Sequence, residues 1–348
     1  MDLQIQYFDP TKMSRTSTVL LIGRRGSGKS TLAADIMSHN CRISEGMCVS
    51  PTDSMTGFWK QYIPPLFIHH EYDQEITREF LEHQHSKWKR YKSNCKKEGV
   101  QPEEGKVDPA FVIYDDVTYD KTFFKNKLTR QLFMNGRHYS TFVLVTCQYL
   151  MDIGPDLRGQ IDYVFILKEP SRNNREKLYE YFAGMFPSYF AFEEALRCCT
   201  DQRECMVIDN TKQSYDVNEC VFFYRATGGL KFRMGSEDFW RFGTENYEST
   251  DGEESGDENE ESAIAKKYFN SGRSKKEIER SAQFKVRKMY PKDDFKPRVA
   301  SDYAVAYRST TTTPLIADIA PGPKEGKKEK KKKIKKIKKD EETKKKKP

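Results

Sequence analysis

The feature that most constrains this chain is a glycine-rich octapeptide between an apolar run and a helix-like stretch. Residues 23–30 read GRRGSGKS, which fits G-x-x-x-x-G-K-[ST] at every fixed position. The apolar run Thr18–Ile22 precedes the octapeptide, and residues 29–38 are predicted to form a helix. A strand, a glycine turn and a helix in this order direct backbone N–H groups at a phosphate. The alternative is a glycine turn with a helix-capping serine and a solvated lysine, but strand, spacing and helix together favour phosphate binding.

Within this phosphate loop each residue type has an expected role. Gly28 lets the backbone approach a phosphate without a Cβ atom, and Lys29 is expected to bridge the β- and γ-phosphate oxygens. The Ser30 hydroxyl is expected to coordinate Mg²⁺. The residues predicted to contact the nucleotide are Gly23, Arg24, Arg25, Gly26, Ser27, Gly28, Lys29, Ser30 and Thr31.

Two acids follow another buried run. Ala110–Tyr114 reads AFVIY and is followed by Asp115 and Asp116. Asp115 would reach the Mg²⁺ water shell at the strand end, and Asp116 would orient and deprotonate an attacking water. An apolar run ending in two acids is common, and alone it would indicate a solvated strand end. Downstream of a phosphate loop it favours a hydrolase over a kinase.

Three further polar residues are candidates for the catalytic site. Gln148 follows the run 141–146 and could sense the γ-phosphate, although a surface amide is the alternative. Arg137 and Arg158 could each act as an arginine finger in a neighbouring subunit's nucleotide site. Arg137 could equally cap the carbonyls of its own helix.

Alternating strands and helices predict an α/β fold with a mostly parallel sheet covered by helices on both faces. Strands are predicted at 18–22, 46–49, 66–69, 110–114, 141–146, 161–167 and 205–208. Helices are predicted at 29–38, 74–91, 121–135 and 172–182.

Charge is segregated toward the C-terminus. The stretch 244–262 holds nine acids and no base, and residues 324–348 hold 15 lysines against five acids. The tail therefore sets the net charge of +8. We predict a folded domain at 1–240, an acidic disordered linker at 241–262, a partly helical or disordered segment at 263–322 and a disordered Lys-rich tail at 323–348.

Some classes of protein are disfavoured. No apolar run approaches the ~20 residues of a membrane span, and the N-terminus lacks signal-peptide character. The eight cysteines are irregularly spaced, which is typical of thiols in a reducing compartment and not of a zinc site.

The segments GRRGSGKST, YDD, NGRHYSTFVLVTCQY and PDLRGQIDYVFIL together resemble the FtsK/HerA-type DNA-packaging ATPases of large nucleo-cytoplasmic DNA viruses. The resemblance covers residues 9–208. It implies a P-loop NTPase with an extra strand between the phosphate-loop strand and the strand ending in the two acids, which the runs 46–49 and 66–69 fit. It also implies ATP and Mg²⁺ as ligands, with Gln148 as a sensor and an arginine near 137 or 158 acting in trans.

The same resemblance implies a homo-oligomeric ring, usually a hexamer, that threads double-stranded DNA into a capsid. Capsid or inner-membrane virion proteins are then expected partners, and the virion or a viral factory the expected location. The Lys-rich tail suits DNA backbone contact or nuclear import, but also a purely solubilising role. A non-motor switch or scaffold that recruits partners through this tail is the alternative function, and a small-molecule kinase is a third.

Overall fold

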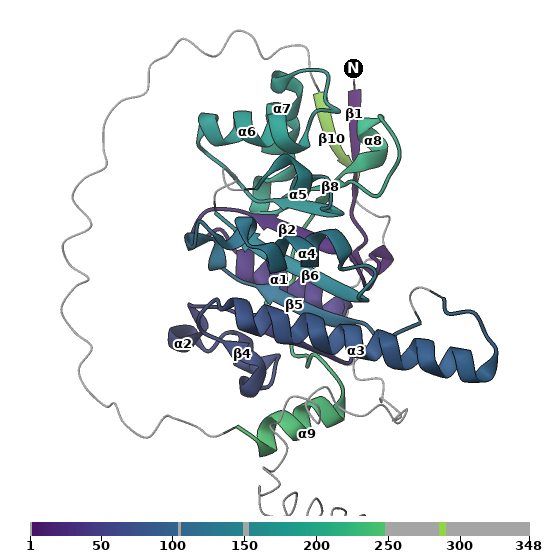
Figure 1. Ribbon diagram of the computed structural model, residues 1–348. Helices are drawn as coiled ribbons and strands as arrows, with labels where there is room; N and C mark the ends of the chain where they lie inside the picture. Colours follow the sequence, from purple (N-terminus) through teal and green to yellow (C-terminus); the bar gives the residue numbers. More distant parts are fainter. Residues whose placement is uncertain (1, 104–105, 149–152, 248–284, 290–348) are drawn as a thin grey trace, which may run out of the picture. The chain divides into compact units, whose positions relative to one another are not determined.

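The computed structural model describes residues 2–103, 106–148, 153–247 and 285–289 (Figure 1). These residues form one ten-stranded sheet in the order β10-β1-β9-β8-β7-β2-β6-β5-β3-β4. The strands are β1 (Asp2–Tyr7), β2 (Thr18–Ile22), β3 (Glu45–Val49), β4 (Ile68–His69), β5 (Ala110–Tyr114), β6 (Thr141–Cys147), β7 (Tyr163–Ile166), β8 (Cys205–Asp209), β9 (Val221–Tyr224) and β10 (Lys285–Met289). Every neighbouring pair is parallel except those that β8 makes with β7 and β9.

The predicted fold class, an α/β P-loop fold with a mostly parallel sheet, is confirmed. Every residue of β2, β3, β5, β6 and β8 is buried, because helices cover both faces of the sheet. An extra strand does separate the phosphate-loop strand from the strand that ends in the two acids, but this strand is β6. The runs assigned to that position, now β3 and β4, lie on the far side of β5.

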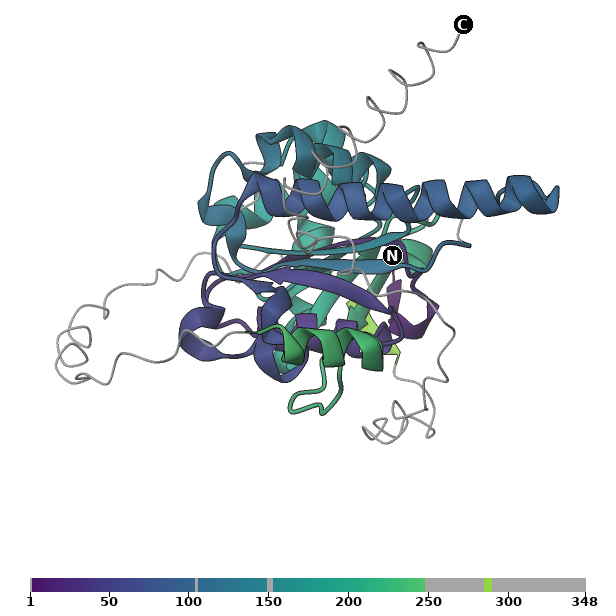
Figure 2. The ribbon, with the colours of Figure 1, turned by 60° about the horizontal axis from the view of Figure 1, so that its bottom comes forward.

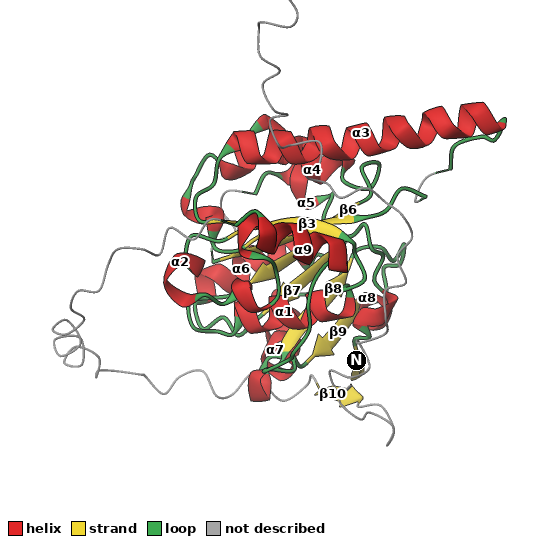
Figure 3. Cartoon of the chain, turned by 90° about the horizontal axis from the view of Figure 1, so that it is seen from below, coloured by secondary structure: helices red, strands yellow, loops and turns green. Residues whose placement is uncertain are grey.

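The helices lie in two layers. Figure 3 shows α3 and α4 on one side of the strands and α1 on the other. The helices are α1 (Lys29–His39), α2 (Asp53–Thr56), α3 (Gln74–Glu98), α4 (Lys127–Asn135), α5 (Pro155–Arg158), α6 (Arg172–Phe182), α7 (Tyr189–Cys199), α8 (Val217–Cys220) and α9 (Glu237–Glu245). Helix α4 begins later than predicted, because the Asn126 side chain accepts a hydrogen bond from the N–H of Leu128 and caps the helix there.

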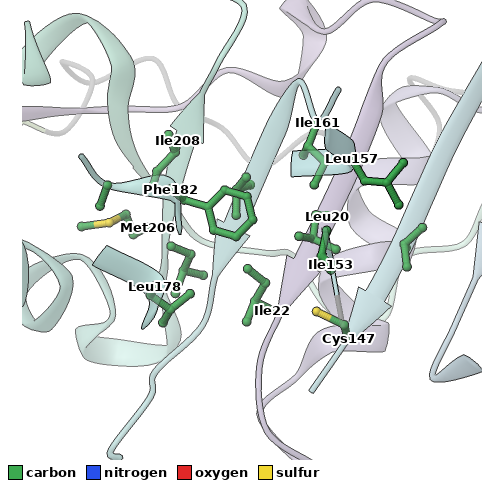
Figure 4. Packing of buried hydrophobic residues seen from close by; sticks show 14 of the residues in the cluster. Leu20, Ile22, Cys147, Ile153, Leu157, Ile161, Leu178, Phe182, Met206 and Ile208 are labelled. Carbon is green, nitrogen blue, oxygen red and sulfur yellow. The ribbon is translucent and has the colours of Figure 1, made fainter. Parts of the chain in front are cut away.

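Alternate residues of β2 pack against opposite faces of the sheet. Leu20 and Ile22 of β2 pack in one cluster with Leu178 and Phe182 of α6 (Figure 4). Their neighbours Val19 and Leu21 are equally buried but point to the opposite face, as strand geometry requires. This packing on both faces fixes the register of β2, and hence the position of the loop that follows it.

The C-terminal predictions are only partly covered. The acidic stretch beyond residue 247, the segment 263–322 apart from β10, and the Lys-rich tail lie outside the described residues. Helix α9 reaches Glu245, past the predicted domain end at 240. Among the described residues, no helix combines the length and apolarity required to cross a bilayer.

Candidate functional site

The phosphate loop turns at the carboxyl end of β2 and leads directly into α1. Gly26 and Gly28 adopt left-handed backbone conformations, with φ of 74° and 96°, that residues other than glycine rarely adopt. Gly23 packs closely, since a Cβ atom built there would lie 2.5 Å from Ser27 Oγ. Arg24, Arg25 and Thr31 are exposed. The predicted strand–turn–helix context of the motif is therefore present.

Lys29 points into the protein, not into solvent. Its side chain is only 5% exposed, and its Nζ donates to the carbonyl of Arg24 at 3.3 Å. The same Nζ lies 3.6 Å from Asp116 Oδ1. Lys29 is therefore held over the loop and beside the second acid of the pair.

Asp115 is a buried carboxylate with a hydrogen bond to each oxygen. Thr146 Oγ1 donates to Oδ1 at 2.8 Å, and Trp59 Nε1 donates to Oδ2 at 2.9 Å. Ser30 Oγ lies 3.4 Å from the same Oδ2. Burial raises the pKa of Asp115 above its ordinary value, while the bonds from Trp59 and Thr146 oppose the rise.

Asp116 adopts a left-handed conformation, with φ of 55°, which is uncommon for a residue other than glycine. Its backbone N–H donates to Thr146 Oγ1 at 2.9 Å, so this single hydroxyl contacts both acids. Gln148 Nε2 donates to Asp116 Oδ1 at 3.2 Å. The turn directs Asp116 toward Lys29 and Gln148, whereas Asp115 faces Ser30.

The strand order explains why these groups meet. In the sheet β6 lies between β2 and β5, with Ile22 paired to Cys147 and Tyr114 paired to Val145. Gln148, directly after β6, therefore lies between the phosphate loop and the acidic pair. The predicted loop, Asp115, Asp116 and Gln148 are brought together at one edge of the sheet.

The two arginines do not join this cluster within the chain. Arg137 forms an ion pair with the buried Asp162, which also accepts a hydrogen bond from the N–H of Thr18 at 2.8 Å. Thr18 begins β2, so Arg137 lies at the opposite edge from the phosphate loop. Arg158 donates to the carbonyl of Ile153 and stacks on the Tyr181 ring at 3.8 Å. Their roles in a neighbouring subunit stay predictions.

A cleft of about 710 Å³ opens beside the phosphate loop. It lies between this loop, the residues after β7 and β9, and the turn that precedes β8. In that turn the consecutive residues Gln202 and Arg203 have φ of 55° and 63°. Arg225, just after β9, donates to the carbonyl of Gln202 at 3.1 Å and joins two walls of the cleft. The lining includes Gly26, Thr31, Leu167, Lys168, Gln202 and Gly228.

Sequence reasoning missed two residues of the site. Thr146 lies within a predicted strand, and the available signal was its position near the carboxyl end of that strand, two residues before Gln148. Trp59 lies in the short 3₁₀ helix Trp59–Gln61 between β3 and β4, and it matches no motif. Only the fold brings its indole to Asp115.

Comparison with known sequences finds relatives among viral proteins. It is 37% identical to uncharacterized protein L437 of Acanthamoeba polyphaga mimivirus over 238 residues, which are 68% of this chain and 81% of L437. The chain belongs to the same family as L437. Uncharacterized protein 075L of Invertebrate iridescent virus 6 is 32% identical over 237 residues, which are 66% of this chain and 86% of 075L. No protein-family model matches the chain.

Solved structures resemble the chain more distantly. B204, the DNA-packaging ATPase of Sulfolobus turreted icosahedral virus, is 17% identical, with a TM-score of 0.42; the match covers 62% of this chain and 100% of B204. The type VII secretion ATPase EccC of Thermomonospora curvata is 13% identical, with a TM-score of 0.40; the match covers 68% of this chain and 29% of the EccC chain. Similarity at this level carries no functional assignment.

Proposed function

We propose that this chain is a Mg²⁺-dependent ATPase whose turnover drives movement of double-stranded DNA, with packaging of a viral genome as its setting. One observation carries the proposal. Lys29, Ser30, Asp115, Asp116 and Gln148 come from three neighbouring strand ends and lie at one edge of the sheet. Phosphoryl transfer to water uses groups of these kinds to hold the phosphates, Mg²⁺ and the attacking water.

The residues at this edge fit a bound Mg²⁺. Ser30 Oγ and Asp115 Oδ2 are hard oxygen donors 3.4 Å apart, beside the phosphate loop. When bound, Mg²⁺ would neutralise charge developing on the phosphate oxygens. Trp59 and Thr146 hold the Asp115 carboxylate in place for that role.

The remaining polar groups would handle phosphate and water. Lys29 Nζ would exchange Asp116 and the Arg24 carbonyl for the β- and γ-phosphate oxygens. Asp116, released from Lys29, would orient the attacking water and accept its proton. Gln148 contacts Asp116 directly, so loss of the γ-phosphate would be transmitted to the segment that follows β6.

The cleft beside the loop provides room for the rest of the nucleotide. Its volume of about 710 Å³ is in the range of small-ligand sites. It begins at Gly26 and Gly28, where the phosphates would sit, and ends at Gln202 and Gly228. We assign the ribose and base to this cleft.

The proposed motor function also requires contacts with other subunits, with virion proteins and with DNA. The family resemblance supports a homo-oligomeric ring, with a hexamer favoured, in which Arg137 or Arg158 would complete a neighbour's site. Capsid or inner-membrane virion proteins would be its partners, in the virion or a viral factory. The Lys-rich tail would add DNA contacts or direct the protein to the host nucleus.

ATP turnover with and without linear duplex DNA tests the proposal, together with the mass of the assembled particle. We expect duplex to stimulate turnover in the wild-type protein and turnover to vanish in Lys29→Ala and Asp116→Asn. Lys12→Ala is the matched control, since Lys12 is exposed. A monomer whose ATP turnover is the same with and without duplex DNA would support the switch or scaffold instead. Phosphate transfer to an acceptor other than water would support a kinase.

A further inference from the structure

The C-terminal part of α3 projects past the sheet. Lys87 Nζ donates to Glu45 Oε1 at 2.6 Å and to the carbonyl of Asp108 at 2.9 Å. Glu45 begins β3, and Asp108 comes just before β5. Lys87 therefore lies at the edge of the sheet where these strands begin, which we call the amino edge. The helix continues to Glu98, and at 1.5 Å per residue its last 11 residues extend about 16 Å further (Figure 2). We call residues 88–98 the basic arm.

The charge of α3 changes sign along its length. Residues 74–86 contain three acids and one base, whereas the basic arm contains five bases and one acid. The bases of the arm are exposed: Lys89, Arg90, Lys92, Lys96 and Lys97. Favourable interaction with the helix dipole accounts for bases in the last turn, but not for those at 89–92. The helix dipole therefore does not account for the whole charge of the arm.

The lysines form a row on the outer surface of the arm. Lys89, Lys92 and Lys96 follow at i, i+3 and i+7, which places them on one side of the helix over about 10 Å. On the adjoining side of the helix Cys95 is buried, and Tyr91 Oη accepts a hydrogen bond from the N–H of Glu103 in the returning chain. The arm is thus anchored along one face while the lysine row faces solvent.

No carboxylate among the described residues forms an ion pair with Lys89, Lys92, Lys96 or Lys97, although Lys92 lies over the Trp88 ring at 5.9 Å. A row of unneutralised cations on a projecting rod is complementary to a polyanion. Lysine ammonium groups are point charges that bind phosphate without the two-pronged geometry used to read bases. A B-DNA major groove of about 12 Å admits an α-helix.

We propose that the basic arm binds the phosphodiester backbone of double-stranded DNA without reading its sequence. The inference rests on the proposed function in naming DNA as the partner, and it adds the surface that holds it. The arm lies at the amino edge of the sheet, opposite the phosphate loop. Duplex would therefore bind away from the nucleotide site.

The test compares two triple variants of the full chain. Lys89→Gln/Lys92→Gln/Lys96→Gln removes the lysine row, and Lys12→Gln/Lys212→Gln/Lys231→Gln removes the same charge from exposed positions elsewhere. The probe is a fluorescent linear duplex of mixed sequence, and its affinity is measured by anisotropy over a series of salt concentrations. Urea unfolding checks that both variants are folded.

We expect the first variant to bind duplex at least about tenfold more weakly at low salt. Its slope of log affinity against log salt should shrink by up to about 2.7, since each lost phosphate contact removes about 0.9. The control should keep the wild-type slope, and both variants should keep the basal ATP turnover. The tail is intact in all three proteins, so its contribution cancels.

An arm variant with the wild-type slope and affinity would overturn the inference. So would equal losses in the two variants, which would show a general charge effect, or a loss of oligomer with unchanged duplex binding, which would assign the arm to a neighbouring copy. These results leave the ATPase proposal standing. Absence of ATP turnover in the wild type, with duplex binding still dependent on the arm, would instead overturn the ATPase and keep the inference.

Discussion

The hydrogen bond from Trp59 to Asp115 predicts a measurable energetic coupling between this tryptophan and the buried carboxylate. Trp59 is 0% exposed and Asp115 is 3% exposed, and the donor and acceptor atoms are 2.9 Å apart. A hydrogen bond to a charged group contributes about 1.5–3 kcal/mol to stability. Both partners are buried, so screening by solvent does not reduce this value. The amide of Asp115→Asn can still accept a neutral hydrogen bond, which contributes about 0.5–1.5 kcal/mol, so we expect a coupling energy of about 1 kcal/mol.

A double-mutant cycle measures the coupling. The free energy of unfolding in urea is determined for the wild type, Trp59→Phe, Asp115→Asn and the double variant. Trp59→Phe alone also loses packing of the larger ring, but this loss occurs in both arms of the cycle and cancels. The coupling energy therefore reports how much stronger the indole's hydrogen bond is to the carboxyl group than to an amide.

Trp240 provides the matched control. Its Nε1 donates to the carbonyl of Met234 at 2.8 Å, in a contact that does not involve Asp115. The cycle that combines Trp240→Phe with Asp115→Asn should be additive within about 0.5 kcal/mol. A Trp59 coupling no larger than this control would refute the reasoning. Trp59 would then fill space beside Asp115 without stabilising its charged form.

Three further predictions follow from buried ionisable groups. Burial raises the pKa of Asp35 to about 6, so the free energy of unfolding of the wild type should fall by up to about 3 kcal/mol relative to Asp35→Asn as pH rises from 4 to 6. Urea unfolding across this range measures the difference. In the variant, the asparagine side-chain oxygen can still accept the hydrogen bond from the Tyr224 hydroxyl. Arg137→Gln should lower the free energy of unfolding by only about 1 kcal/mol: it removes the ion pair of the buried Asp162, but the Arg137 side chain is 66% exposed and solvent screens the pair. Unchanged stability with loss of ATP turnover would instead favour a role of Arg137 in the site of a neighbouring subunit. Burial raises the pKa of Cys147 to about 12, so iodoacetamide at pH 8 should modify it only after unfolding, as peptide mass mapping would show.

The phosphate loop and the acidic pair could be predicted because their signals are local. A glycine loop must follow a strand to work, and a strand covered on both faces is continuously apolar, as Thr18–Ile22 and Ala110–Tyr114 are. Strand order is not local. Nothing in the chain order of β3 and β6 shows which of them lies beside β2, so the inserted strand was assigned to the wrong run.

Other elements were missed because their patterns are weak. The prediction ended α3 at Tyr91, because beyond that point the arm lacks the apolar periodicity that marks a packed helix. Its lysines and arginine are nonetheless good helix formers, and Gly99 ends the helix in a left-handed conformation with φ of 69°. Strand β9 is as long as several predicted strands, but it follows α8 directly at Val221, so no turn residue marks where it begins.

The position of β6 links the two edges of the sheet. At its carboxyl end, Thr146 contacts Asp115 and Asp116, and Gln148 follows directly. At its amino end, Thr141 pairs with Ala110 of β5, close to the carbonyl of Asp108 that Lys87 holds. The acidic pair and the start of the basic arm are therefore connected through one pair of adjacent buried strands. Under the proposed function, β5 and β6 are therefore the strands through which a change in the acidic pair would act on the basic arm, and substitutions in the Lys87 contacts should alter the stimulation of ATP turnover by duplex DNA.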